Sequence, residues 1–327
     1  MMRHGLPAFA SLFRPFHWLG WICLWAVVSA AAVAQAPPRP PAASLTGPLA
    51  DEEPITPIPQ PPPADPLKLA LGERLFYDRR LSADGTLACS SCHDVRINGA
   101  SGSAVHRGSS FFDTLTVFNA SLNYRLNWEG NFRSLGAQVE SALENSVNLR
   151  TSVDEVVRKL NGDPDIVRDF RAAYGRPPQR DNLLDALVTF ERSLLTPGSR
   201  FDRWLGGDAS ALSANELEGY RLFKSFGCSS CHQGVNIGGN LFERQGIFRQ
   251  LVKGQPETVR VPSLRNVAAT APYFHDGSAA TLEEAVKRMA AAQLDRTLTD
   301  QQVTSIVAFL QTLTGNYRGA PIVRAAP

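Results

Sequence analysis

Apolar positions recur along most of the chain at spacings of three and four residues, which is the pattern of amphipathic helices. Two clear segments of this kind run from Asp181 to Leu195 and from Thr299 to Leu313, and Pro197-Gly198 and Gly315 end them. No convincing stretch of alternating apolar and polar residues competes with these helices. The pattern therefore predicts an all-α fold.

Capping residues mark the starts of further helices. Three Ser or Thr residues are followed three positions later by Glu, the spacing at which the two side chains cap a helix reciprocally. These pairs are Ser152 and Glu155, Ser213 and Glu216, and Thr281 and Glu284. Asp163-Pro164 adds an N-cap followed by proline at the first helical position.

The helical pattern occurs twice. One helix contains Gly72-Glu73-Arg74-Leu75-Phe76, and a later one contains Gly219-Tyr220-Arg221-Leu222-Phe223. Each of these helices precedes a Cys-Ser-Ser-Cys-His segment. The first unit ends with the helix over Asp181–Leu195, and the second unit ends with the helix over Thr299–Leu313. This internal repeat predicts two similar domains, 67–198 and 199–317, followed by a tail over 318–327.

Residues 1–34 have the composition of a secretory signal. Arg3 and Arg14 precede an apolar run from Trp18 to Ala34 that ends in the small residues of a cleavage site. The alternative is an uncleaved anchor, because 17 apolar residues are at the lower limit for a bilayer core about 30 Å thick. Residues 35–66 are rich in proline and are expected to form an extended, poorly ordered linker.

After loss of the signal the chain is formally neutral, since 31 of its 33 basic residues remain beside 31 acidic residues. A neutral chain does not attract a polyanion, so no nucleic-acid partner is predicted. Cys23 is lost with the signal, and the four remaining cysteines all belong to the two Cys-Ser-Ser-Cys-His segments. No disulfide framework is therefore expected, although an exported protein would be permitted one.

Cys-x-x-Cys-His is the spacing at which two thiols attach a haem covalently while the adjacent His ligates its iron. The attaching cysteines would be Cys89, Cys92, Cys228 and Cys231, and the ligating histidines His93 and His232. A thioredoxin-like pair or a zinc ribbon also uses Cys-x-x-Cys, but neither explains a His after both pairs. A zinc site of four thiolates would also have to close across 135 intervening residues. The motifs therefore predict two c-type haems.

The second ligand of each iron has few candidates. Met289 is the only methionine beyond the signal, and it lies in the same repeat as His232. A thioether there would favour ferrous iron and raise that haem's potential, whereas the alternative role is core packing. His106, in a Gly- and Ser-rich segment past His93, could reach the iron of the first haem or lie at the surface.

The sequence resembles the bacterial di-haem cytochrome c peroxidases and the related MauG-type enzymes over nearly the whole body, from Pro66 to Gly315. Besides the haem motifs, the resemblance rests on ordered motifs. These are Leu71-Gly72-Glu73-Arg74-Leu75-Phe76-Tyr77-Asp78, Thr116-Val117-Phe118-Asn119, Phe190-Glu191-Arg192-Ser193-Leu194 with Thr196-Pro197, Gly238-Gly239, Val261-Pro262-Ser263-Leu264-Arg265-Asn266 and Thr270-Ala271-Pro272-Tyr273-Phe274-His275-Asp276-Gly277. The resemblance implies two cytochrome c-like domains in a periplasmic enzyme. Such an enzyme reduces hydrogen peroxide to water with electrons from a small cytochrome c or cupredoxin.

In this family the second haem stores electrons at high potential, with His and Met ligands that match His232 and Met289. The resemblance further implies a first haem that reacts with peroxide and is ligated at rest by a loop His, which matches His106. A Trp between the haems matches Trp128, an expected electron relay, although burial of a large aromatic needs no further reason. MauG-type enzymes, which oxidise a protein, have Tyr where this chain has Met289.

The resemblance also implies a calcium ion at the junction of the two domains. Its ligands are mainly carbonyl oxygens, which match Thr270 and Pro272, together with an Asn position that is Asp113 in this chain. Oxygen ligands suit Ca2+, and an aspartate would serve as well as an asparagine. A homodimer is compatible with the family.

One departure from the family pattern bears on the chemistry. The catalytic pair beside the first haem is Gln and Glu; Gln138 matches the Gln, but Asn148 stands where the Glu belongs. Asn cannot carry a proton from one peroxide oxygen to the other. Glu140 and Glu144, one helical turn apart, could take over this role or be solvated surface charges. The rival functions are therefore a non-catalytic electron-transfer cytochrome, which Asn148 favours, and a MauG-type oxidase, which Met289 disfavours.

Overall fold

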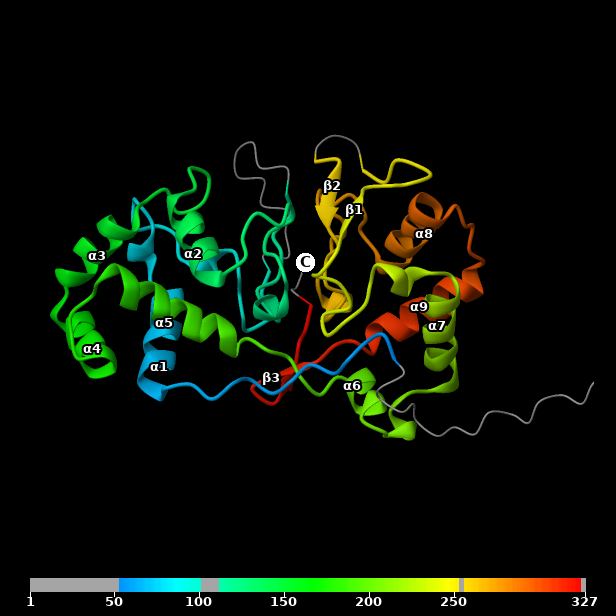
Figure 1. Ribbon diagram of the computed structural model, residues 1–327, viewed down its shortest axis with the longest axis horizontal. Coiled ribbons are helices and arrows are strands. Elements are labelled where there is room, and N and C mark those ends of the chain that lie inside the picture. The colour runs from blue at the N-terminus through cyan, green and yellow to red at the C-terminus, as the bar shows by residue number, and fades with distance from the viewer. Residues whose placement is uncertain (1–52, 101–111, 253–255, 325–327) are drawn as a thin grey trace, which may run out of the picture. The chain divides into compact units, whose positions relative to one another are not determined.

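The computed structural model describes residues 53–100, 112–252 and 256–324. The predicted signal, much of the predicted linker and His106 lie outside the described residues. Within these ranges the predicted all-α class is confirmed, because strands are confined to two short antiparallel pairs (Figure 1). The pairs join β1 (Phe242–Arg244) to β2 (Thr258–Arg260) and β3 (Asn316–Tyr317) to β4 (Ala320–Pro321).

The first half is built from helices that share one core. They are α1 (Pro66–Phe76), α2 (Leu135–Glu144), α3 (Val153–Asn161), α4 (Pro164–Tyr174) and α5 (Arg180–Ser193). Their apolar faces meet around buried side chains that include Leu75, Val156 and Phe170. Burial of such faces is what stabilises helices of this length, because short helices are marginal in water.

The second half has a core of its own. Its helices are α6 (Arg200–Leu205), α7 (Ala214–Ser225), α8 (Leu282–Leu294) and α9 (Asp300–Gln311). Three aromatic rings lie at its centre, with centroids 4.9 to 5.1 Å apart, from Phe201, Tyr220 and Phe309. None of the helices in the described part of the chain is long and apolar enough to cross a membrane.

The predicted helix caps are present. Side-chain oxygens accept hydrogen bonds from backbone N–H groups of the first turn at Ser152, Asp163, Ser213 and Thr281. At the start of α7 the capping is reciprocal, because the Ser213 N–H also donates to the Glu216 carboxylate at 2.8 Å. Each such cap satisfies a donor that has no partner within the helix and is worth about 1 kcal/mol.

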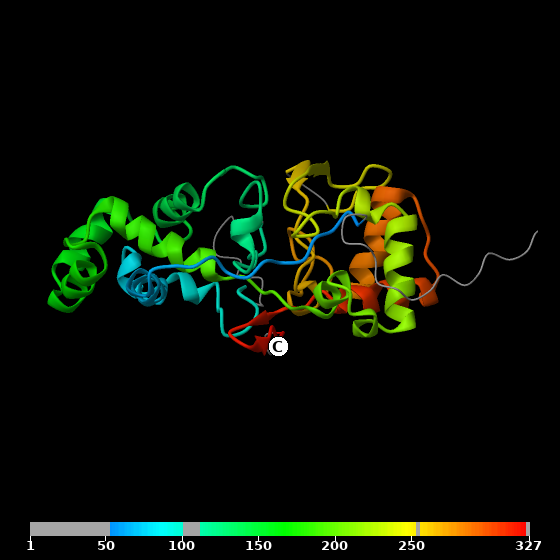
Figure 2. The same ribbon diagram turned by 60° about the horizontal axis from the view of Figure 1, so that its bottom comes forward.

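The same close helix crossing occurs in both halves, as the sequence repeat suggests. α1 packs on α5, and α7 packs on α9 (Figures 1 and 2). A Cβ atom at Gly72 would lie 2.0 Å from the Ala186 carbonyl oxygen, and one at Gly219 would lie 1.9 Å from the Ser305 carbonyl oxygen. Only glycine allows backbones to approach so closely, which explains the glycine of each repeated motif.

Residues 53–58 pack against the second half, so the prediction of a poorly ordered linker is wrong for this strap. Ile55 and Ile58 are only 0% and 5% exposed, and Ile55 belongs to the core of the second half. The Glu53 carboxylate accepts a hydrogen bond from the Tyr220 hydroxyl. Two isoleucines between prolines show no periodicity, so the apolar pattern did not reveal this segment.

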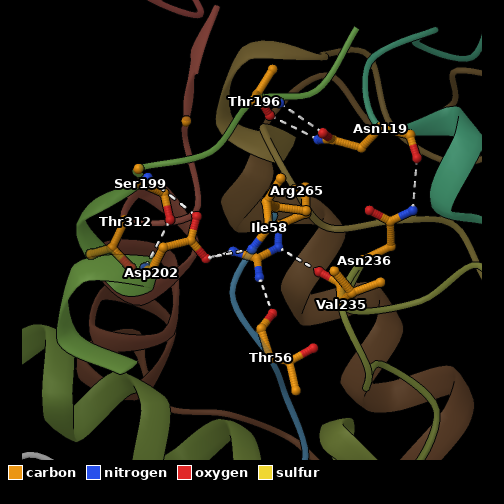
Figure 3. Close-up of polar contacts among 12 residues, drawn as sticks. Thr56, Ile58, Asn119, Thr196, Ser199, Asp202, Val235, Asn236, Arg265 and Thr312 are labelled. Atoms are coloured by element: carbon orange, nitrogen blue, oxygen red, sulfur yellow. Dashed lines mark hydrogen bonds and ion pairs between the residues drawn. The ribbon is translucent and has the colours of Figure 1, made fainter. Parts of the chain in front are cut away.

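A buried ion pair anchors the strap (Figure 3). The Arg265 guanidinium, 2% exposed, pairs with the Asp202 carboxylate at 2.8 Å. It also donates to the carbonyl oxygens of Thr56 and Val235, both at 2.8 Å. The Ile58 N–H donates to the same Asp202 oxygen at 3.3 Å. Because each charge has a partner and further hydrogen bonds, the pair is tolerated in the interior and fixes the strap in place.

Buried asparagines join loops of the two halves (Figure 3). Asn119 Nδ2 donates to Thr196 Oγ1 at 2.8 Å, and the Thr196 N–H donates back to Asn119 Oδ1 at 2.9 Å. Asn236 Nδ2 donates to the Asn119 carbonyl oxygen at 2.9 Å, and Asn266 Nδ2 donates to Thr196 Oγ1 at 3.0 Å. Asn119 and Asn266 both have positive φ, near 60°, a conformation that asparagine tolerates better than most residues.

Residues 318–324, the described part of the predicted tail, pack on the first half. Ile322, 6% exposed, joins an apolar cluster with Phe76 and Phe190. The Arg318 guanidinium pairs with the Glu73 carboxylate of α1 at 2.6 Å. A single isoleucine and one arginine form no periodic pattern, so the sequence could not predict that these side chains pack on the first half.

Candidate functional site

The first Cys-x-x-Cys-His motif lines a cavity of about 460 Å³. Cys89, Cys92 and His93 form part of its wall, and α1 and α5 supply apolar neighbours. His93 Nδ1 lies 3.1 Å from the Gly99 carbonyl oxygen. A hydrogen bond at Nδ1 fixes the orientation of the ring and leaves Nε2 to bind a metal.

The second motif lines another cavity, of about 250 Å³, with the same arrangement. Cys228, Cys231 and His232 form part of its wall, and His232 Nδ1 lies 3.2 Å from the Ile237 carbonyl oxygen. Burial lowers the pKa of His232 to about 4. The imidazole is therefore neutral near pH 7, which is the form that ligates iron.

Both motifs have a backbone geometry that suits a covalently attached haem. Short 3₁₀ turns span Cys89–Ser91 and Cys228–Ser230. The N–H of His93 donates to the Cys89 carbonyl at 2.9 Å, and that of His232 to the Cys228 carbonyl at 3.0 Å. These turns bring both thiols and the imidazole of each motif to one cavity wall. The residues present therefore fit two c-type haems, each with one His ligand.

The candidates for the second iron ligands stand differently. Met289, on α8, lines the same cavity as His232 and packs against a small apolar cluster that includes Leu251 and Ala292. The structure thus brings the expected thioether to the second cavity, and its bond to iron stays a prediction. His106 lies outside the described residues, so its predicted approach to the first haem also stays a prediction.

The two cavities share part of their walls, and Trp128 belongs to the shared part. Its indole Nε1 donates to the Asp113 carbonyl at 2.8 Å, and its own carbonyl accepts from the Arg260 N–H at 2.7 Å. The ring meets His275 edge to face, with centroids 6.3 Å apart. Trp128 is therefore held firmly at the place where an electron relay is expected, and the relay role stays a prediction.

Gln138 and Asn148 both line the first cavity, as the family pattern suggests. The two carboxylates that were candidates to replace the missing Glu are not in that wall. Glu140 pairs with Arg180, and Glu144 is exposed. A general acid must come within hydrogen-bond reach of its substrate, so the geometry does not bring either carboxylate to the place where the reaction needs it.

Glu191, near the end of α5, is a carboxyl group of the first cavity that the sequence reading did not single out. Burial raises the pKa of Glu191 to about 8. The Glu191 side chain is therefore largely protonated at neutral pH. It stood within a family motif, but motif membership alone does not tell whether a helical residue points inward.

The residues of the expected calcium site gather at one wall. Asp113, Thr270 and Pro272 all line the second cavity. Among the described residues, no group of three or more His, Cys, Asp or Glu side chains is arranged to hold a metal ion. A calcium site here would depend on carbonyl oxygens, and it stays a prediction.

Known proteins resemble both halves of the chain. Residues 66–210 match the family model of the di-haem cytochrome c peroxidases, and residues 217–314 match that of cytochrome c. The cytochrome c peroxidase of Escherichia coli (strain K12) is 38% identical over 298 residues, which cover 84% of this chain and 64% of the relative. The cytochrome c551 peroxidase of Nitrosomonas europaea is 36% identical over 289 residues, which cover 83% of this chain and 86% of the relative.

A solved structure shows the same architecture. The crystal structure of a MauG-like protein associated with microbial copper homeostasis matches with a TM-score of 0.69 and 28% identity, covering 79% of this chain and 93% of the other. Together with the two family models, this match confirms the expected fold of two cytochrome c-like domains.

Proposed function

Because the chain belongs to the di-haem cytochrome c peroxidase and MauG family, we propose that it reduces hydrogen peroxide to water with electrons from a small redox protein. One observation carries the proposal. Two cavities each present a Cys-x-x-Cys-His motif, and they share a wall that contains Trp128. Bound there, two haems would supply one iron for peroxide and a second iron for storing an electron.

Residues of the second cavity suit electron storage. His232 would offer a neutral imidazole, and Met289 a thioether from the same cavity wall. A thioether favours ferrous iron, which suits a high-potential centre. Met289 also disfavours the other activity of the family, oxidation of a protein, since MauG-type enzymes have Tyr at that position.

The two amides of the first cavity, Gln138 and Asn148, suit peroxide binding better than proton transfer. Gln138 can donate and accept hydrogen bonds, and so can Asn148. Neither amide can carry a proton between the two oxygens, so peroxide cleavage should be slow compared with an enzyme that has Glu at position 148. Met289 and Trp128 favour catalysis, whereas Asn148 is the observation that favours the second candidate, a di-haem cytochrome that only transfers electrons.

The proposal includes a periplasmic location and a small donor, either a cytochrome c or a cupredoxin. The secretory pattern of residues 1–34 supports export. Cytochrome c motifs in both halves support a donor that exchanges single electrons.

The decisive experiment is a turnover assay of the half-reduced holoprotein. Hydrogen peroxide is added with a reduced small cytochrome c, and oxidation of that donor is followed by its absorbance. Reduction of one peroxide to two waters consumes two protons and two electrons, so two donor molecules should be oxidised per peroxide.

Trp128→Phe should slow this oxidation while keeping the haem content. Trp204→Phe, in the core of the second half and outside both cavity walls, should not.

Two outcomes would contradict the proposal. A protein with two haems that oxidises no donor in the presence of peroxide would establish the electron-transfer cytochrome instead. A protein of apoprotein mass that binds zinc at its cysteines would overturn both candidates.

A further inference from the structure

Arg260, the last residue of β2, is a buried cation that lacks a buried anion. It is 3% exposed, its Nε donates to the Asn127 carbonyl at 3.0 Å, and its Nη1 lies 3.4 Å from the Val261 carbonyl oxygen. No carboxylate among the described residues pairs with it, and burial lowers the pKa of Arg260 to about 10. Burial of an unpaired charge costs free energy, so we expect an anion to bind next to the Arg260 guanidinium.

Arg265 is a second buried arginine, and unlike Arg260 it pairs with a carboxylate of the same chain. It is as buried as Arg260, at 2%, and it pairs with the Asp202 carboxylate. The two internal segments outside the described residues, 101–111 and 253–255, contain no Asp or Glu, so neither can supply the same partner to Arg260. No carboxylate in the described part of the chain pairs with Arg260, so a group bound in the cavities that it lines is a source of the missing anion.

The position of Arg260 indicates which anion this is. Its side chain lines both cavities, and its N–H holds the Trp128 carbonyl at 2.7 Å. His275 is 2% exposed, lines the second cavity as well, and has an Nδ1 atom without a hydrogen-bond partner in the described part of the chain. Buried polar atoms are normally hydrogen-bonded, so the wall of the second cavity contains a guanidinium without an anion and an imidazole nitrogen without a partner.

We propose that Arg260 binds a propionate carboxylate of the second haem, with His275 as an additional hydrogen-bond partner. The inference rests on the proposed function only in that the second cavity holds a haem. A haem is largely apolar and carries two carboxylates at one edge, and a guanidinium binds a carboxylate through two parallel hydrogen bonds. Because the backbone of Arg260 also holds Trp128, one residue positions both the haem and the expected relay.

The charge of Arg260 should raise the potential of the second haem. Reduction removes one positive charge from the iron, so a nearby cation favours the reduced state, and the low dielectric of the interior strengthens this effect. Without Arg260 the propionate would be an uncompensated anion that favours ferric iron. Arg260→Gln should therefore lower the reduction equilibrium constant of the second haem about tenfold, which is 59 mV for one electron.

The test is spectroelectrochemical titration of the holoprotein, with the haem content verified beforehand. Arg260→Lys keeps the charge but not the fork of donors, so it should recover most of the potential while broadening the spectrum of the second haem. Arg249→Gln is the matched control, because Arg249 is an exposed arginine of the second half that pairs with Asp295 and lies outside both cavity walls. Its potentials should equal those of the wild type.

The outcomes separate the inference from the proposed function. An unchanged potential of the second haem in Arg260→Gln, or a shift confined to the first haem, would overturn the inference and leave peroxide reduction untouched. The measurement requires no peroxide, so a protein without turnover can still support the inference. Absence of haem in the wild type would overturn both.

Discussion

Glu191 places an ionisable carboxyl group in the wall of the first cavity, and burial raises its pKa to about 8. In the unfolded chain a glutamate has a pKa of about 4.3. Between these two values the folded protein holds a proton that the unfolded chain releases. The contribution of this proton to the free energy of unfolding is therefore fully present below about pH 4.3, and it is lost as the pH rises through the folded pKa.

Glu191→Gln should remove this dependence. The melting temperature of the variant, relative to that of the wild type, should rise between about pH 5 and about pH 8.5, because only the wild type has a carboxyl to ionise. Scanning calorimetry of the holoprotein measures the difference. Glu144→Gln, at an exposed position of α2, is the control variant. If the melting temperatures of Glu191→Gln and the wild type differ equally at about pH 5 and about pH 8.5, the raised pKa of Glu191 is contradicted.

Asn148 is the residue whose replacement should improve catalysis. Asn148→Glu should raise peroxide turnover, since a positioned general acid and base typically contributes about 10²- to 10⁴-fold. Steady-state kcat per haem is the measurement. Asn240→Glu, an exposed position outside both cavity walls, is the matched control and should have no effect. If Asn148→Glu leaves kcat unchanged, proton transfer does not limit this enzyme.

Residues of the site could be predicted to different extents. The positions of Cys89 and His93 in one cavity wall follow from a local motif, because a five-residue spacing survives in any fold that binds the haem. Glu191 could not be placed, since its inward position depends on how α5 is rotated against α1. Arg260 was missed for a related reason, because the sequence does not show that a single basic residue of a short strand is buried.

At the scale of helices and strands, the glycines of the two crossings carry a clear prediction. Gly219→Ala should destabilise the protein by about 1–3 kcal/mol, because the new Cβ would overlap the Ser305 carbonyl and force α7 away from α9. Gly136→Ala, in α2, meets nothing within 4 Å and should be neutral or stabilise by up to about 1 kcal/mol. Urea unfolding of the holoprotein measures both. Equal effects would show that the crossing has room for a methyl group.

Helices could be predicted because their signals are local. The predicted closing helix over Asp181–Leu195 corresponds to α5, Arg180–Ser193, and the one over Thr299–Leu313 to α9, Asp300–Gln311. The pairing of β1 with β2 could not be predicted, since each strand has only three residues and no tight turn joins them. Such a pair depends on the loops that it joins rather than on its own propensity.

At the scale of the whole molecule, the two similar halves follow from the internal repeat, whereas the strap depends on contacts far away in the chain. Ile55→Ala should destabilise the second half by about 2–5 kcal/mol, the usual cost of truncating a fully buried isoleucine. Ile247→Ala, at a side chain 58% exposed, is the same substitution at the surface and should change stability by less than about 0.5 kcal/mol. Thermal unfolding with a probe in the second half compares them, and equal melting temperatures would mean that residues 53–58 are a free linker.

The strap, residues 53–58, also affects the order in which parts of the newly synthesised chain can fold. The Thr56 carbonyl and the Arg265 guanidinium that holds it are 209 positions apart. With synthesis at about 5–20 residues per second, Thr56 emerges roughly 10–40 s before its partner. During that interval Ile55 and Ile58 have no core to enter and can associate with other chains. The part of the body that is made first is thus among the last to reach its final place, so a nascent chain of this protein should be a client for chaperones until its second half is complete.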